Sequence, residues 1–432
     1  MHDPKVTYRS VFGIEQDPPQ WKTAFDHANH GLRYGLVEGF LPAWETAASL
    51  PIPNVKLEKW RWLDFSQVGF GEAPVCMKPQ FQLEVEILPV GEETPDHKLA
   101  WPEGLVITTL SGAMETHWDL VARLIKRINK PTKEKFQALS EALAREGLFV
   151  YVPRGVRVDG VVVAKLRGET AAGLTAMRSI IWLEQGAELT LVLDMQSKSR
   201  ATADNLLQIA KTDLVLEEDA TLHFTDVSIL NQEVTNLRYN QAALARGTKL
   251  NWIYTAVATA LGKQSLEVNL EGEGAEAEVN GIYFPAEGQK ISVDTVQNHL
   301  APRTKSNLLF RGAAIGDGEA IWRVMINVDP IAEKTDGYQS NQNLMLGEHS
   351  EIKSIPGLEI KADDVSCSHG ATVGRIDETE LFYLQARGIP LVEAERLIVE
   401  GFFAEVIEKI PVEEIRNKLG ERLLKKFEAS NQ

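Results

Sequence analysis

The chain has 432 residues, and 45 Lys and Arg against 61 Asp and Glu give it a formal charge of −16. This charge argues against nucleic acid as a partner, because the phosphates would be repelled. No apolar run reaches the roughly 18 to 20 residues that span a bilayer, and residues 1–10 lack the pattern of a secretion or import signal. With two cysteines a disulfide framework is not expected, so we predict a cytoplasmic protein without membrane contact.

The N-terminal third is predicted to be largely helical. In Pro19–Ala47 and Thr132–Glu146, apolar residues recur at three- and four-residue spacing, which is the pattern of a helix with one buried face. Between them, Leu57–Trp118 is mixed, with short apolar runs interrupted by Pro and Gly, and we assign no chemistry to it. We therefore expect a mixed, largely helical domain over residues 1–147.

From about Gly147 to Gly374 the pattern changes to short strands. Short segments alternate apolar and polar side chains, and no helical period intervenes. Strands repeatedly end in a turn that holds Gly or Asp, and these turns recur about every 30 residues except for one longer gap. This repeat favours the stacked coils of a β-helix over a β-sandwich, which would also have many short strands. The predicted core spans residues 148–375, and the turn segments begin at Leu183, Leu216, Leu244, Gly272 and Leu346.

After Asp377 the pattern becomes helical again, and we expect a C-terminal helical domain over residues 376–432. One helix spans Glu378–Arg387, and a second starts near Pro390, since Pro is favoured in the first turn. The second helix carries two adjacent apolar rows, which together are wider than the roughly 100° stripe of a surface helix. One row can pack within the chain and the other can contact a partner. The alternative is that both rows are buried within the chain. The rows are Ile398, Phe402 and Val406, and Val399, Phe403 and Ile407.

Residues 358–377 contain the candidate for metal chemistry. If this segment is extended, Cys367 and His369 project to the same side, because strand side chains alternate with a period of two. A thiolate and an imidazole on one face form half of a soft-metal site. The only other cysteine is Cys76, so such a site would have to be shared with a second protein. The alternative is that Cys367 is a small buried apolar residue and His369 a hydrogen-bonded surface imidazole.

Motifs for self-contained enzyme chemistry are absent from the sequence. There is no G-x-x-x-x-G-K-[ST], no G-x-G-x-x-G, no G-x-S-x-G and no H-E-x-x-H. Gly312–Gly318 is rich in glycine but lacks the lysine, and we interpret it as a turn. Asp363 and Asp364 are interpreted as turn residues, and His299 and His349 as surface or loop histidines. We therefore expect no catalytic residues and no permanently bound cofactor.

The segment Ala362–Phe402 resembles the SufB/SufD family of iron–sulfur cluster assembly scaffolds, and in particular its SufD branch. Residues 293–312 are similar to the family pattern His-x-Ala-Pro-x-Thr, and residues 329–352 to Lys-Thr-Asp followed by Gln-x-x-Asn-Leu. The SufB branch typically places an acidic residue directly after the His, whereas Gly370 stands there in this chain. The strand at residues 320–326 departs from the more polar, Asn-Gly-containing strand of relatives, which leaves the resemblance intact.

The resemblance implies a right-handed parallel β-helix flanked by N-terminal and C-terminal helical domains, in a scaffold that is not an enzyme. It implies that the β-helix pairs with SufB and that the C-terminal helices dock the ABC-type ATPase SufC. A transient iron–sulfur cluster would form at the SufB interface, where His369, and Cys367 if its thiol binds rather than packs, face a cysteine of SufB. The residues that would dock SufC are Ile398, Phe402, Phe403 and Val406.

Two alternatives remain. A self-pairing SufB-like scaffold is disfavoured by Gly370, and a β-helix enzyme acting on polysaccharide would need acids clustered on adjacent coils.

A backbone turn after His369 would give Gly370 a positive φ, a conformation that glycine adopts readily.

Overall fold

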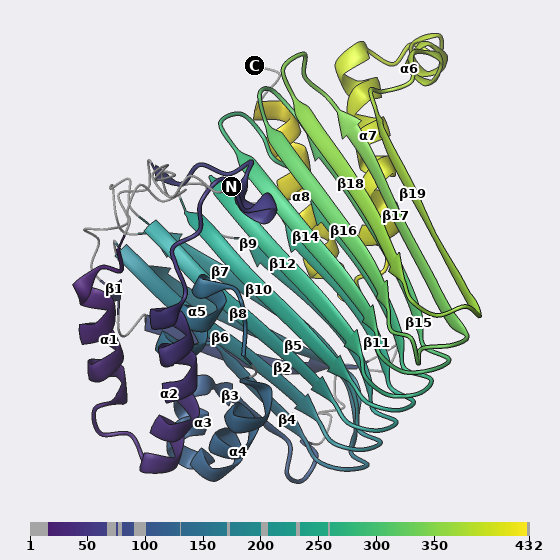
Figure 1. The fold of residues 1–432 in the computed structure, drawn as a ribbon. Helices are drawn as coiled ribbons and strands as arrows, with labels where there is room; N and C mark the ends of the chain where they lie inside the picture. The colour runs from purple at the N-terminus through teal and green to yellow at the C-terminus, as the bar shows by residue number, and fades with distance from the viewer. Residues whose placement is uncertain are drawn as a thin grey trace, which may run out of the picture.

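The computed structural model describes residues 16–66, 75–76, 80–89, 101–129, 131–170, 173–199, 206–229, 234–257 and 260–429. Two long sheets face each other as the walls of a solenoid, and helices lie against them (Figure 1). The prediction of a β-helix core between N-terminal and C-terminal helices is confirmed.

The helical elements are α1 (Pro19–Asn29), α2 (Tyr34–Ser49), the short 3-10 helix η1 (Glu58–Trp60), α3 (Leu110–Thr116), α4 (Trp118–Ile128), α5 (Lys135–Leu143), α6 (Glu378–Gln385), α7 (Leu391–Ile407) and α8 (Glu413–Ala429). The strands are β1 (Val75–Cys76), β2 (Gln80–Leu88), β3 (Val106–Thr109), β4 (Leu148–Val152), β5 (Arg157–Thr170), β6 (Gly173–Leu183), β7 (Glu188–Ser199), β8 (Leu206–Leu216), β9 (Thr221–Ile229), β10 (Thr235–Leu244), β11 (Lys249–Ala256), β12 (Leu261–Leu270), β13 (Glu276–Tyr283), β14 (Lys290–His299), β15 (Lys305–Ala314), β16 (Glu319–Val328), β17 (Thr335–Met345), β18 (Glu351–Ile360) and β19 (Val365–Gly374).

The chain passes alternately between two sheets. We call them the even sheet, in the order β18-β16-β14-β12-β10-β8-β6-β4-β3 with β1 beside β6, and the odd sheet, in the order β19-β17-β15-β13-β11-β9-β7-β5-β2. Strands from β4 onward pair in parallel, whereas β3 joins β4 and β2 joins β5 in the antiparallel sense. Each coil therefore adds one strand to each sheet. The N-terminal region also contributes β1, β2 and β3 to these sheets, so it is less separate than the largely helical domain predicted from the sequence.

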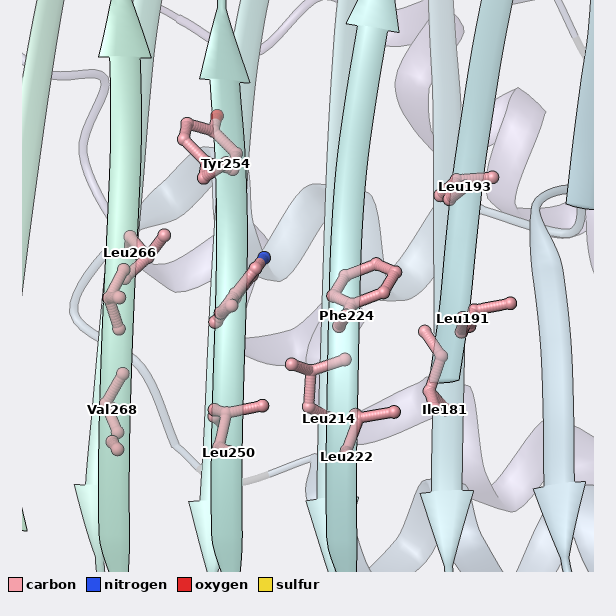
Figure 2. Close-up of a cluster of buried hydrophobic side chains, with 14 of the residues drawn as sticks. Ile181, Leu191, Leu193, Leu214, Leu222, Phe224, Leu250, Tyr254, Leu266 and Val268 are labelled. Atoms are coloured by element: carbon pink, nitrogen blue, oxygen red, sulfur yellow. The ribbon is translucent and has the colours of Figure 1, made fainter. Parts of the chain in front are cut away.

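The space between the sheets is filled by apolar side chains from both walls. Alternate residues along each strand point inward, as Leu191 and Leu193 of β7 and Leu222 and Phe224 of β9 do (Figure 2). Leu191 and Phe224 are register partners, so inward positions stack from one coil to the next. Full burial of such a side chain stabilises the fold by roughly 1.5 to 3 kcal/mol. The alternation read from the sequence is therefore the pattern of this inner face.

One corner of the solenoid is a ladder of turns with left-handed backbone. Gly186, Asp219 and Gly247 have φ of 68°, 59° and 68°, a region that glycine occupies without steric cost. The amide of Gly186 donates to the carbonyl of Glu218 in the next coil at 2.9 Å, and the amide of Gly247 donates to the carbonyl of Glu273 at 3.0 Å. These turns are the ones predicted from the recurring Gly and Asp.

The longer gap in the predicted repeat has a structural reason. The same corner continues through Gly274, Arg303 and Lys334, whose φ values are 71°, 57° and 60°. Arg303 and Lys334 do not look like turn residues in a sequence, so two coils are missed. The predicted turn near Leu346 belongs to the opposite corner, where a Cβ on Gly347 would lie 2.6 Å from the carbonyl oxygen of Gly316.

Helices cover the outer faces of both sheets. Helices α1 to α5 pack on the even sheet, where Phe136 and Leu139 of α5 share a buried cluster with Ile180 of β6. Helices α7 and α8 pack on the odd sheet, where Phe403 and Leu419 share a cluster with strand residues such as Ile282. The covered coils are thus buried on both sides of each sheet, whereas α6 projects beyond the strands (Figure 1).

Candidate functional site at the open end of the solenoid

The last coil of the solenoid consists of β18 and β19, which end the even and odd sheets in the part of the chain that the structure describes. Ile352 is the one buried residue of β18, and β19 has none. The outer edges of these strands present backbone N–H and C=O groups that can pair with another strand. This end of the solenoid is therefore open to a partner.

The two residues predicted to share one face lie on β19. Cys367 pairs in register with Gly337 of β17, and His369 pairs with Gln339. Because Gly337 and Gln339 belong to the inward-facing row of β17, Cys367 and His369 both lie on the inner side of the last coil. No further coil covers them within the described residues.

The two side chains differ in exposure. His369 is exposed, and among the described residues no side chain forms a hydrogen bond with its imidazole. Cys367 is half-buried and packs beside a small apolar cluster that includes Ile326, Val328 and Leu358. His369 can therefore meet a partner directly, while Cys367 is reached only from the side of the open coil.

Burial raises the pKa of the Cys367 thiol above its ordinary value, although a backbone hydrogen bond from Gly337 acts in the opposite direction. The thiol is therefore protonated at neutral pH and is not an activated nucleophile. A bound metal ion would remove this proton, because the thiolate is the form that ligates metals.

Polar side chains continue beneath the last coil. His299, interpreted from the sequence as a surface or loop residue, is fully buried at the end of β14. It contacts the hydroxyl groups of Thr304 and Ser306 at 2.7 and 2.8 Å. Gln339 is also fully buried, and its Oε1 has no partner in the described structure, while its Nε2 donates to the carbonyl of Gly357 at 3.3 Å. The interior beneath the last coil thus contains buried polar side chains as well as apolar ones.

The turn expected after His369 does not occur. Gly370 lies within β19 and is not among the residues with positive φ. A Cβ at this position would meet only the hydroxyl of Tyr338, at 3.5 Å. The prediction of a positive φ is therefore wrong, because the strand runs on to Gly374 before α6 begins. The turn lies before the strand instead, where the carbonyl of Asp364 accepts a hydrogen bond from the amide of Lys334.

Among the residues that the structure describes, no three His, Cys, Asp or Glu side chains are grouped so that they could hold a metal ion. Cys76 lies on β1 and pairs in register with Thr175 of β6, in the first coils rather than the last. Cys367 and His369 thus offer an incomplete ligand set, and the missing ligands would come from another molecule.

The helical residues predicted to dock a partner are only partly available. Phe403 and Val406 are 1% and 0% exposed because they pack on the odd sheet, so the docking prediction is corrected for these two. Ile398 is half-buried. Phe402 is half-buried as well, with the guanidinium of Arg311 5.0 Å from its ring centre. The buried residues Val399, Phe403 and Val406 come from both apolar rows, so neither row is wholly left for a partner.

The exposed apolar residues of this region lie on α6 and the start of α7. Helix α6 has no buried residue, and Phe382 and Tyr383 are 71% and 56% exposed. Leu391 and Val392 extend the patch onto the first turn of α7. Sequence reasoning missed this patch, although the short helix between Asp377 and Pro390 has too few apolar residues on one face to bury itself.

None of the described helices is long and apolar enough to span a membrane.

Two models of known protein families match the chain. Residues 166–402 match the family model described as "SUF system FeS cluster assembly, SufBD core domain", and residues 90–163 match "SufBD protein N-terminal region". The chain is 27% identical over 399 residues to the iron-sulfur cluster assembly protein SufD of Bacillus subtilis, covering 88% of this chain and 91% of that protein. It is 28% identical over 337 residues to SufD of Escherichia coli, with 76% and 79% covered. Bacillus subtilis SufB is 26% identical over 314 residues, with 72% and 66% covered.

Proposed function

The chain belongs to the SufB/SufD family of SUF-system iron–sulfur cluster assembly proteins, and from this premise we propose that it is a SufD-like scaffold subunit without enzymatic activity. It pairs with a SufB-type subunit and binds a SufC-type ATPase in the cytoplasm. The observation that carries the proposal is the exposed imidazole of His369 beside the thiol of Cys367 on the terminal strand of the solenoid.

Pairing with a SufB-type subunit uses the open end. The free edges of β18 and β19 can receive strands of a second β-helix through main-chain hydrogen bonds. This places His369 at the junction, where a cysteine of the partner completes the ligand set. The iron–sulfur cluster is cargo that forms there and leaves. Neutral imidazole is a borderline ligand that binds iron and exchanges, which suits a transient site.

The ATPase docks on the exposed patch of α6 and α7. Large apolar side chains gathered on an exposed surface typically mark an interaction site. Phe382, Tyr383 and Val392 are its aromatic and aliphatic anchors, and α7 connects them to the odd sheet through Phe403. Nucleotide-driven movement of the ATPase would therefore be transmitted to the solenoid through α7.

The cluster role is tested by His369→Ala in the chain co-expressed with its SufB- and SufC-type partners. The complex should purify in normal yield, because an exposed imidazole contributes little to stability, while iron, acid-labile sulfide and visible absorption should fall sharply. The matched control is His349→Ala, which removes an exposed histidine from the turn before β18. Normal cluster content in the His369→Ala complex would remove the central chemical claim.

The docking role is tested by the triple change Phe382→Ser, Tyr383→Ser and Val392→Ser. Binding to the SufC-type ATPase should weaken by about 2 kcal/mol or more if any of the three is a hot spot, with the unfolding temperature unchanged. Tyr34→Ser, at an exposed aromatic of the N-terminal helices, is the control for loss of surface apolarity. Undiminished ATPase binding would place docking elsewhere, and a stable homodimer of the isolated chain would favour the self-pairing scaffold.

A further inference from the structure

The thiol of Cys367 and the imidazole of His299 face the same small space. Gly337 lies between them in the inward row of the odd sheet, because Ser306, Gly337 and Cys367 are successive register partners. A Cβ on Gly337 would lie 3.2 Å from the Cys367 sulfur, 3.4 Å from Cδ1 of Ile326 and 3.5 Å from Nε2 of His299. Because Gly337 has no side chain, the sulfur and the ring nitrogen border the same position, together with the methyl group of Ile326.

One neutral tautomer of His299 satisfies all of its contacts at once. Its Nδ1–H donates to the hydroxyl of Thr304 at 2.7 Å, while that hydroxyl donates to the carbonyl of Ala301 at 3.1 Å. In the neutral ring Nε2 then has a lone pair, which accepts from the hydroxyl of Ser306 at 2.8 Å. Fixing one ring nitrogen as a donor is how proteins prepare the other for a metal.

Burial lowers the pKa of His299 to about 4, so the ring is neutral at physiological pH. Such an imidazole is too weak a base to deprotonate the Cys367 thiol, whose pKa is raised by burial. A nucleophile–base pair is therefore a poor interpretation of the two groups. A neutral imidazole lone pair beside a cysteine is instead the start of a soft-metal donor set.

We propose that Cys367 Sγ and His299 Nε2 are two ligands of an inner iron(II) half-site, entered from the open end of the solenoid, and that Gly337 provides its clearance. Binding replaces the thiol S–H bond with a sulfur–iron bond and releases the proton to water, and Ser306 turns its O–H away from Nε2. The iron keeps its charge of 2+, so no oxidant or reductant is involved. The identity of the ion as iron rests on the proposed function, whereas the ligand pair rests on geometry.

The site also gives Cys367 a role different from that of His369. His369 is exposed and faces the partner, while Cys367 turns toward an interior imidazole two coils below its own strand. An ion held between Cys367 and His299 would lie under the interface before the partner's ligands reach it. Cys367 would then hold the metal even in the unpaired chain.

The test uses the full chain alone, reduced and free of oxygen, titrated with Co²⁺ as the probe. The unmodified chain should develop a thiolate-to-cobalt charge-transfer band. Cys367→Ser should abolish the band, and His299→Gln should weaken Co²⁺ binding by at least about 10- to 100-fold, which is the loss expected when only a partner of a metal ligand is removed. His349→Ala, at an exposed histidine in the turn before β18, should keep the band. A folded His299→Gln chain with unchanged cobalt affinity would overturn the proposal, as would absence of the band in the unmodified chain.

Because His299→Gln changes a buried residue, Gly337→Ala supplies a second measurement. Its methyl group would occupy the shared space, so cobalt affinity should fall while the circular dichroism spectrum is retained. Gly370→Ala, on the same pair of strands but with room for a methyl group, is the matched control and should bind cobalt normally. Normal affinity in Gly337→Ala would contradict the assignment. These measurements need no partner protein. If the cobalt band is present while cluster assembly by the complex fails, the ligand pair is supported and the proposed function is not.

Discussion

The covered coils and the last coil of this solenoid obey the same strand pairing but differ in burial. In the middle, β11 and β13 are enclosed by neighbouring coils, and α7 and α8 lie against the outer face of the odd sheet. At the beginning, antiparallel β2 and β3 close the two sheets. At the end, every residue of β18 and β19 except Ile352 is half-buried or exposed. Apolar residues are thus concentrated in the covered coils, where they stabilise the fold. The last coil is left free to contact another molecule.

The largest expected contrast concerns inward-facing residues. Trp252 of β11 is fully buried, and Trp252→Ala should destabilise the protein by about 3 to 5 kcal/mol, because it removes packing and leaves a cavity. Val373 occupies an inward position of β19 but is 41% exposed, so Val373→Ala should cost less than about 1 kcal/mol. Chemical denaturation of both variants measures the contrast. Equal losses would mean that the last coil is as well packed as the middle.

A second difference should appear in the dependence of stability on pH, because His299 is buried beneath the last coil. Its pKa is lowered from an ordinary value of about 6.5 to about 4, so the unfolded chain binds a proton that the folded chain excludes. This contribution to stability is complete above about pH 6.5 and is lost as pH falls toward 4. At pH 5 the loss should be about 2 kcal/mol.

The measurement for His299 is the unfolding free energy between pH 7 and pH 5, compared with that of His299→Gln. The variant should show a flatter dependence on pH, whatever its stability at neutral pH. An identical slope in both proteins would show that other groups dominate the acid response. The substitution changes no carboxylate, so the difference between the two proteins isolates the imidazole.

The smallest effect is expected at a glycine of the last coil. Gly370→Ala should change stability by no more than about 0.5 kcal/mol, because the added methyl group meets only the Tyr338 hydroxyl, at 3.5 Å. In the covered coils, Gly281 lies on the inward row of β13, where a Cβ would lie 2.1 Å from the ring of Phe310. Gly281→Ala should cost about 1 to 3 kcal/mol through overpacking. Thermal melts of the pair provide the comparison, and a severe loss in Gly370→Ala would show hidden packing at the open end.

The coils of the solenoid were predictable from the sequence where a glycine marks a turn with left-handed backbone. Gly186 and Gly247 occupy left-handed corners, so their recurrence predicts coils, whereas Arg303 and Lys334 occupy the same corner without a recognisable pattern. The strand at Cys367 and His369 was predictable from side-chain alternation. The interior pair could not be found in this way, because His299 meets Cys367 only after two further passages of the chain, through Ser306 and Gly337.

Helix α7 shows a different limit of sequence reasoning. Its apolar rows indicate that two faces avoid water, but they do not indicate which molecule covers each face. Phe403 and Val406 turn out to be covered by the chain's own odd sheet. Buried charges cannot be recognised from the sequence either. Arg238 and Asp226 each look like surface residues in the sequence, but they form a 2.6 Å ion pair in the interior.

The corner ladder of amide-to-carbonyl hydrogen bonds ends at Lys334 and Asp364, and this end has a thermodynamic consequence. In a solenoid each coil contacts only its neighbours, so opening an interior coil breaks two interfaces and opening a terminal coil breaks one. Amide hydrogen exchange should therefore be fastest in β18 and β19 and slow progressively toward the middle. A partner seated on this end turns the terminal coil into an interior one. Its affinity then includes the free energy of ordering that coil, and protection of β18 and β19 from exchange becomes a direct measure of assembly.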